Sequence, residues 1–136
     1  MRAFSFEPIG VIRSEIKSRK DAPLFYTDKG APNALLEITP TYLGGLHRMQ
    51  AGDEIIVITW LHRARRKVLK VHPRGNKSNP LTGVFSTRSP DRPNPLGLHR
   101  VKVLEIDTGR LHIGPIEVID GTPVLDIKPV LGVTDY

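Results

Sequence analysis

The amino-acid sequence predicts an all-β protein, a small single-domain β-barrel with long proline-rich loops and little helix. Two observations support this prediction. Short apolar segments rich in β-branched residues recur along the chain with glycine or proline between them, which is typical of strands. The periodicity of an amphipathic helix is almost absent. A length of 136 residues suits one domain, so a single domain is expected to cover residues 1–136.

The predicted strands begin near the N-terminus. Residues 6–14 and 34–38 carry apolar side chains at short spacing, as strands do. Residues 54–61 are rich in β-branched side chains on both faces of a pleat, which predicts a central strand covered on two sides. Residues 107–110 are expected to form a turn between the last two of four further strands, at 67–72, 83–87, 98–106 and 111–118.

Helix and loops account for the rest of the chain. Residues 40–49 predict a turn or two of helix, with Thr39 or Thr41 as its cap. Two long loops remain, at 14–33 and 73–97, and the second holds five of the 12 prolines. Because each proline ring fixes φ, that loop is expected to be rigid, and long shaped loops commonly carry function.

The residue inventory excludes several kinds of site. The chain has no cysteine, so disulfides, thiolate nucleophiles and cysteine-ligated metals are excluded. The five histidines lack the spacing of a helical zinc site, so no metal is expected. Neither a P-loop nor a GxGxxG fingerprint is present, so any cofactor must bind in another way. No apolar run approaches the roughly 20 residues that span a bilayer, and the first residues do not resemble a secretory signal. We therefore expect a cytoplasmic protein without a membrane partner.

Charge is distributed unevenly along the chain. Residues 55–104 hold eleven bases and one acid, whereas residues 105–136 hold two bases and six acids. Between Glu54 and Asp91 there is no carboxylate in 36 residues, a pattern typical of a surface that contacts phosphate or nucleic acid. A solvated basic loop would give the same pattern. If RNA is the partner, the predicted phosphate contacts are Lys67, Lys70, Arg74 and Lys77.

Three strings of residues carry the candidate chemistry. The first string, GVFSTRSPDRPNPLGL at 83–98, carries Arg88 and Arg92 on a loop stiffened by proline. Because solvent-exposed arginines need no preorganised backbone, this rigidity indicates a functional role for the two guanidiniums. Trp60-Leu61-His62-Arg63 ends the central strand, where a lone histidine is also a common structural residue. The third string, DGTPVLDIKP at 120–129, places Asp120 and Asp126 around a tight turn, and an ordinary turn at Asp120-Gly121 would also explain this pattern.

These strings, together with IGVIRS at 9–14, strongly resemble the TsaA-like, or TrmO, family of S-adenosylmethionine-dependent tRNA methyltransferases. The resemblance covers nearly the whole chain and includes the highly specific string RSPxRPNPxGL. It implies a compact β-barrel that forms a homodimer and binds S-adenosylmethionine near the dimer interface. It also implies methylation of the exocyclic nitrogen of threonylcarbamoyl-adenosine beside the tRNA anticodon. By position in the shared motifs, the implied cofactor contacts are His62, Arg63, Arg88, Leu98, Gly114, Pro115, Ile116 and Glu117.

Methyl transfer of this kind depends mainly on holding the acceptor nitrogen in line with the methyl group and the sulfur, because the sulfonium already makes the methyl group electrophilic. A base can remove the proton of the acceptor nitrogen, and the candidate catalytic residues are Asp120 and Asp126, with no choice between them. The family usually has a polar triplet where this chain has Pro23-Leu24-Phe25, so stacking on Phe25 or Tyr26 is expected instead. The alternative function is a module that binds S-adenosylmethionine or RNA without turnover.

Overall fold

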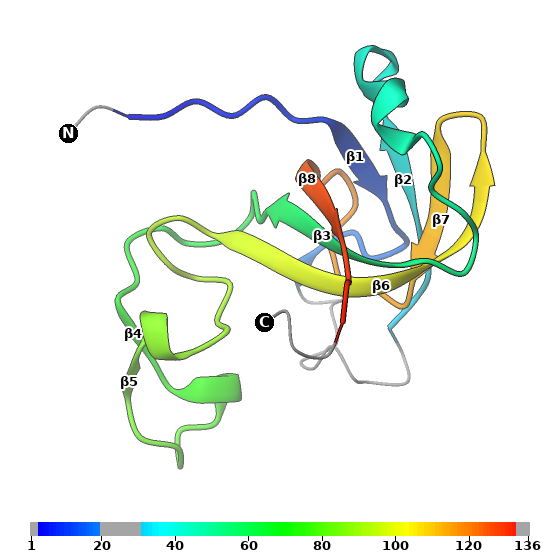
Figure 1. Ribbon diagram of the computed structural model, residues 1–136. Helices are drawn as coiled ribbons and strands as arrows, with labels where there is room; N and C mark the ends of the chain where they lie inside the picture. The colour runs from blue at the N-terminus through cyan, green and yellow to red at the C-terminus, as the bar shows by residue number, and fades with distance from the viewer. Residues whose placement is uncertain (1–2, 20–30, 133–136) are drawn as a thin grey trace.

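The computed structural model describes residues 3–19 and 31–132. Six antiparallel strands close into a barrel in the order β1-β2-β7-β6-β3-β8, and β4 and β5 form a separate two-stranded sheet (Figure 1). The predicted β-barrel with little helix is confirmed. The barrel strands are β1 (Gly10–Arg13), β2 (Ala34–Ile38), β3 (Glu54–Trp60), β6 (Leu96–Asp107), β7 (Arg110–Gly114) and β8 (Pro123–Pro129).

Alternate residues of each strand fill the barrel interior. Ile12 of β1, Leu36 of β2 and Val57 of β3 are fully buried, and their neighbours in sequence face outward. Burying a side chain of this size contributes roughly 1.5–3 kcal/mol, so the interior is the main source of stability. The same cluster includes Ile55, Val101, Val103, Leu111, Ile113, Ile116, Val118 and Val124.

β3 is central, as predicted, with β6 on one side and β8 on the other. It is not covered on both faces, because a closed barrel has a single interior and Ile56 and Ile58 remain half-buried on the outside. The prediction that this strand is covered on both faces is therefore wrong. β6 extends this surface with exposed leucines, so the barrel wall carries an outer apolar strip, defined as Ile56, Ile58, Leu96 and Leu98.

β8 is a strand that the sequence pattern does not indicate. Its flanking prolines and the polar pair Asp126 and Lys128 are typical of a loop. Nevertheless, residues 124–129 pair with β3, and Pro123 and Val124 pair with β1, which closes the barrel. The prolines stand at the two ends of the strand, where a missing N–H interrupts little of the ladder.

Three predicted strands are shortened and one is replaced. Of the segment predicted at 6–14, only β1 (Gly10–Arg13) is a strand. The strand predicted at 111–118 stops with β7 at Gly114, since Pro115 has no N–H to continue the ladder. Gly114 has φ 153° and no room for a Cβ beside Asn33. Of the segment predicted at 67–72, only β4 (Lys70–Val71) pairs, with β5 (Thr82–Gly83). The strand predicted at 83–87 is mostly a short 3-10 turn, η4 (Val84–Ser86).

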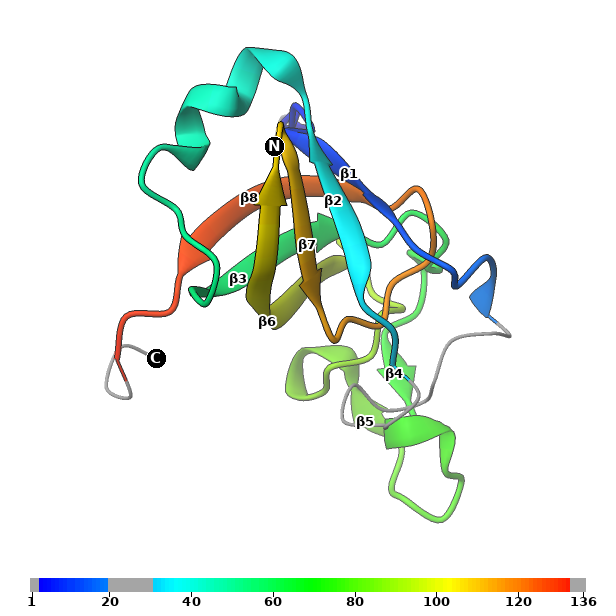
Figure 2. The same ribbon diagram turned by 90° about the vertical axis from the view of Figure 1, so that its right-hand side faces the viewer.

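The predicted short helix is confirmed as a 3-10 helix, η2 (Pro40–Leu46). Thr39 is its N-cap residue, but the Thr39 side chain makes no capping hydrogen bond. Residues 62–95, called the basic lobe below, leave the barrel between β3 and β6 and contain β4, η3 (Pro73–Gly75), β5 and η4. Figure 2 shows η2 and the β4–β5 sheet at opposite ends of the molecule.

Candidate functional site

Main-chain hydrogen bonds fasten the basic lobe to the end of β3. The N–H of Leu61 donates to the carbonyl oxygen of Pro95 at 2.8 Å, and the N–H of Arg92 donates to that of Arg65 at 3.0 Å. The N–H of Arg65 donates in turn to Oδ1 of Asp91 at 2.8 Å. The two ends of the lobe therefore lie side by side, and the proline-rich loop has a defined position against the barrel.

Two charged side chains strengthen this junction. Asp91 accepts two hydrogen bonds from Arg19, at 3.1 and 3.0 Å. Partial burial acts to raise the pKa of Asp91, but the hydrogen bonds and charges of Arg19 and Arg65 outweigh it and lower that pKa.

Arg66 also strengthens the junction. Its guanidinium carbon lies 5.0 Å from the centroid of the Trp60 ring, a cation–π contact. Arg66 also donates to Pro93 and Asn94, so the side chain serves the scaffold.

The two arginines of the proline-rich loop have different roles. Arg92 points inward and donates to three carbonyl oxygens, of Ser89 at 2.8 Å, Val84 at 2.6 Å and Thr87 at 2.5 Å. Arg88 is exposed, and its guanidinium makes no hydrogen bond or ion pair with any residue that the structure describes. Arg92 is therefore a structural clamp, and Arg88 is available to a ligand.

His62 and Arg63 leave β3 at the same junction, and both are exposed. Partial burial of the ring, and then the charge of Arg63, lower the pKa of His62. Like Arg88, Arg63 has no ionic partner within residues 3–19 and 31–132. The structure thus places three of the predicted cofactor contacts on the two segments that the junction joins.

The other predicted contacts lie on β6, at the end of β7 and in the segment that follows β7. Leu98 is 56% exposed in the outer apolar strip. Gly114 pairs with Lys102, which in turn pairs with Glu54 at the start of β3, so Gly114 lies towards the opposite end of β3 from His62. Gly114 and Pro115 line a shallow depression of about 320 Å³. Ile116 packs its side chain into the barrel core, and Glu117 is half-buried.

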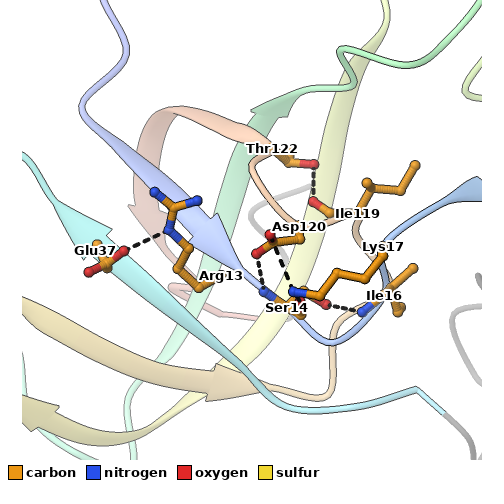
Figure 3. Close-up of polar contacts among 8 residues, drawn as sticks. All are labelled: Arg13, Ser14, Ile16, Lys17, Glu37, Ile119, Asp120 and Thr122. Carbon is orange, nitrogen blue, oxygen red and sulfur yellow. Dashed lines mark hydrogen bonds and ion pairs between the residues drawn. The ribbon is translucent and has the colours of Figure 1, made fainter.

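The two candidate carboxylates are not brought together. Asp120 closes the seam between β1 and β8: its Oδ1 accepts the N–H of Ser14 at 2.9 Å, and its Oδ2 lies 3.3 Å from Nζ of Lys17 (Figure 3). The bond from Ser14 and the proximity of Lys17 lower the pKa of Asp120 against the opposing effect of burial. Asp126 is exposed on β8 and lies 3.4 Å from Nζ of Lys128. It also lines a cavity of about 750 Å³ beneath η2, which none of the predicted cofactor contacts reaches.

The four predicted RNA contacts are exposed on the basic lobe. Lys70 lies in β4 and Lys67 precedes it, while Arg74 and Lys77 lie in and after η3. Within the part of the chain that the structure describes, no group of three histidine or acidic side chains could hold a metal ion. In the same part, no helix is long and apolar enough to cross a membrane. The expected contacts of Phe25 and Tyr26 lie outside the described residues.

Sequence reasoning missed several residues that shape this region. His99 is half-buried and its Nε2 shares a hydrogen bond with Thr59 Oγ1 at 2.8 Å. Desolvation of the ring lowers the pKa of His99 from 6.5 to about 4. Arg65, Arg66 and Asp91 build the junction, yet in the sequence they are indistinguishable from surface charges. The signal that was available is Asn94 between two prolines, because a residue so constrained is suited to a fixed contact.

The comparisons with known proteins agree with the sequence motifs. The family model described as the tRNA-methyltransferase O N-terminal domain matches residues 11–136. A Pyrococcus horikoshii protein named "Probable S-adenosyl-L-methionine-binding protein" is 43% identical over 130 residues, which cover 93% of this chain and 82% of that protein. An S-adenosyl-L-methionine-binding protein of Archaeoglobus fulgidus is 40% identical over 124 residues, 90% of this chain and 86% of its own length.

A solved structure shares the fold. The crystal structure of TrmO from Pseudomonas aeruginosa matches 100% of this chain with a TM-score of 0.75 and 30% sequence identity. The match covers 60% of that TrmO chain, so the present chain spans well under two thirds of the solved protein.

Proposed function

The chain belongs to the family of tRNA-methyltransferase O N-terminal domains, and on this premise we propose that it is a cytoplasmic S-adenosylmethionine-dependent tRNA methyltransferase. The observation that carries the proposal is the junction of the basic lobe with the barrel. Arg66 and Arg92 are engaged by the scaffold there, whereas Arg63 and Arg88 make no ionic contact among the described residues. A fixed junction that leaves one guanidinium free on each of its two segments is suited to an anionic ligand.

The donor set fits S-adenosylmethionine, which supplies an electrophilic methyl group when bound. Arg63 or Arg88 would hold the carboxylate, since a guanidinium matches a carboxylate in geometry and charge. The exposed Leu98 offers an apolar surface for the adenine. The lowered pKa of His62 favours the neutral ring at pH 7, and a neutral imidazole would hydrogen-bond to the cofactor without adding positive charge. The segment from Gly114 to Glu117 would supply the remaining contacts, with Ile116 contributing only its main chain, because its side chain is buried in the barrel core.

Arg88→Ala tests the cofactor site. A charged hydrogen bond is worth roughly 1.5–3 kcal/mol, so the affinity for S-adenosylmethionine should fall about tenfold or more while the fold persists. Titration calorimetry measures the affinity, and Arg110→Ala, a change at another exposed arginine, is the control. Unchanged affinity in the Arg88 variant would remove Arg88 from the site.

The proposed acceptor is the exocyclic nitrogen of threonylcarbamoyl-adenosine beside the anticodon. Nucleoside mass spectrometry of tRNA incubated with the protein and labelled cofactor tests it, and label in another nucleoside would reject this acceptor. Asp120 and Asp126 remain the proposed bases. The variants Asp120→Asn and Asp126→Asn test them. The variant that loses methylation rate while keeping its affinity for the cofactor identifies the base. If neither variant loses rate, water takes the proton.

The proposed tRNA surface is the basic lobe. Replacing Lys67, Lys70, Arg74 and Lys77 together by alanine should weaken RNA binding uniformly across sequences and flatten its salt dependence, since each lost phosphate contact removes somewhat under one unit of slope. Filter binding at several salt concentrations measures this. An unchanged slope would remove the lobe from RNA binding.

We also propose a homodimer, supported by the outer apolar strip. Leu96 and Leu98 are exposed on the barrel wall beside the half-buried Ile56 and Ile58, and such an apolar surface is typical of a protein interface. Sedimentation at micromolar concentration with cofactor present should find a dimer, and finding a monomer would reject it.

A binding module without turnover is the second candidate function. It is favoured by the engagement of Asp120 in the seam, and bound cofactor with no methylated tRNA would select it.

A further inference from the structure

Phe85 is a large apolar side chain that the fold leaves in solvent. It is 82% exposed, although the neighbouring Val84 is almost fully buried. Among the described residues, the Phe85 ring makes no aromatic or cation contact. An aromatic ring gains free energy when it is buried, and the fold leaves the Phe85 ring available to a ligand.

The turn that carries Phe85 is held from both sides. Arg92 donates to the carbonyl oxygens of Val84 and Thr87, the residues that bracket the turn. The N–H of Val84 donates to the carbonyl oxygen of Leu69 at 2.9 Å, which ties the turn to the β4 side of the lobe. The main chain that presents the ring is therefore fixed before any ligand arrives, which lowers the entropy lost on binding.

The lobe that carries Phe85 is strongly basic. Residues 62–95 hold nine bases and one acid, Asp91, which is paired with Arg19. Such a surface attracts a polyanion. An exposed aromatic ring among basic side chains is the arrangement that binds single-stranded nucleic acid, because the phosphates pair with the positive charges and the nucleobases stack on the rings.

We propose that Phe85 is a stacking platform for an unpaired base of the RNA that the basic lobe binds. The inference rests on the proposed function in that it takes RNA as the partner. It adds a positioning residue: Phe85 holds the RNA loop by one base, and Arg92 holds the turn that presents the ring.

The experiment compares variants of the full chain for binding to an anticodon stem–loop RNA. Phe85→Ala should weaken binding about tenfold, because stacking of one base on an aromatic ring is worth roughly 1–3 kcal/mol. The salt slope should stay unchanged, since no charge is lost. Phe85→Trp should restore the affinity, whereas Leu81→Ala, which removes a similarly exposed aliphatic side chain of the same lobe, should change it less than about twofold. Affinity for S-adenosylmethionine should be the same in all variants.

The outcomes separate this inference from the proposed function. If the fourfold basic variant loses RNA affinity while Phe85→Ala retains it, the stacking role is wrong and RNA binding stands. If neither variant changes RNA affinity, both fail. If Phe85→Ala shifts the protein from dimer to monomer at unchanged RNA affinity, the ring packs against a second copy and the stacking role is again wrong.

Discussion

The barrel and the basic lobe are stabilised by different interactions. Thirteen buried hydrophobic residues form the barrel core, whereas in residues 62–95 only Val84 and Pro95 are buried. The lobe depends instead on directional hydrogen bonds, many of them donated by Arg66 and Arg92. Burial stabilises a whole cooperative unit, while a hydrogen bond fixes local geometry at a modest net gain. The barrel therefore sets the stability of the protein, and the lobe sets the shape of its ligand-binding surface.

Leu36→Ala is the strongest test of this division. Leu36 is fully buried in β2, and its truncation should lower the free energy of unfolding by about 4 kcal/mol, through lost burial and the cavity left behind. Urea unfolding followed by circular dichroism measures the loss. Truncation of the exposed Leu69 in the lobe is the matched control and should cost under about 0.5 kcal/mol. Equal losses at the two sites would contradict the division.

Acid should weaken the barrel through His99. Its pKa is about 4 in the folded protein and 6.5 in the absence of burial, so between these values the unfolded chain binds more protons. Stability should therefore fall as the pH drops from 6.5 to about 4, by up to roughly 3 kcal/mol. Asp91 and Asp120, whose pKa values are lowered, lose their contribution only below this range.

His99→Gln isolates this effect, because glutamine can still hydrogen-bond to Thr59 but does not titrate in this range. Urea unfolding of both proteins at pH 7 and pH 4.5 should give a smaller difference in the variant. The same pH dependence in both proteins would show that another group is responsible.

Asp91→Ala should have a much smaller effect on global stability than Leu36→Ala. It removes the acceptor of Arg19 and of the Arg65 N–H at a partly exposed site, so the free energy of unfolding should fall by about 1 kcal/mol. Amide hydrogen exchange should nevertheless accelerate in the basic lobe and remain unchanged in β3 and β6. Asp91→Asn, which keeps an acceptor for Arg65, should show less acceleration, and uniform acceleration through the barrel would place the lobe within the core unit.

The strands that face the interior could be predicted from sequence because alternation of apolar residues reports burial on one side. β8 could not, since its polar Asp126 and Lys128 face outward and its prolines are typical of a loop. The end of β7 at Pro115 was missed, although a proline within a strand is a recognised signal. The 3-10 turn at Val84 depends on the Arg92 side chain, a tertiary contact that local propensity does not contain.

The candidate site was partly predictable for a similar reason. Motif resemblance singled out His62, Arg63 and Arg88, and the structure places them on the joined segments of one junction. Residue type and spacing alone do not separate Arg88 from Arg92, because both lie in the same proline-rich string. The resemblance named Arg88 as a cofactor contact, and the structure adds that the Arg92 side chain turns inward. The separation of Asp120 from Asp126 likewise follows from strand pairing, which the spacing of six residues conceals.

The seam between β1 and β8 also has a consequence for the order of folding. The Ser14–Asp120 bond joins residues 106 positions apart, and β1 and β8 meet over two residue pairs, against seven between β3 and β6. Closing so long a loop costs chain entropy and gains few contacts, so the seam should form after the rate-limiting step. Asp120→Ala should then speed unfolding and leave the folding rate unchanged in stopped-flow experiments. A slower folding rate would place closure of the barrel within the nucleus.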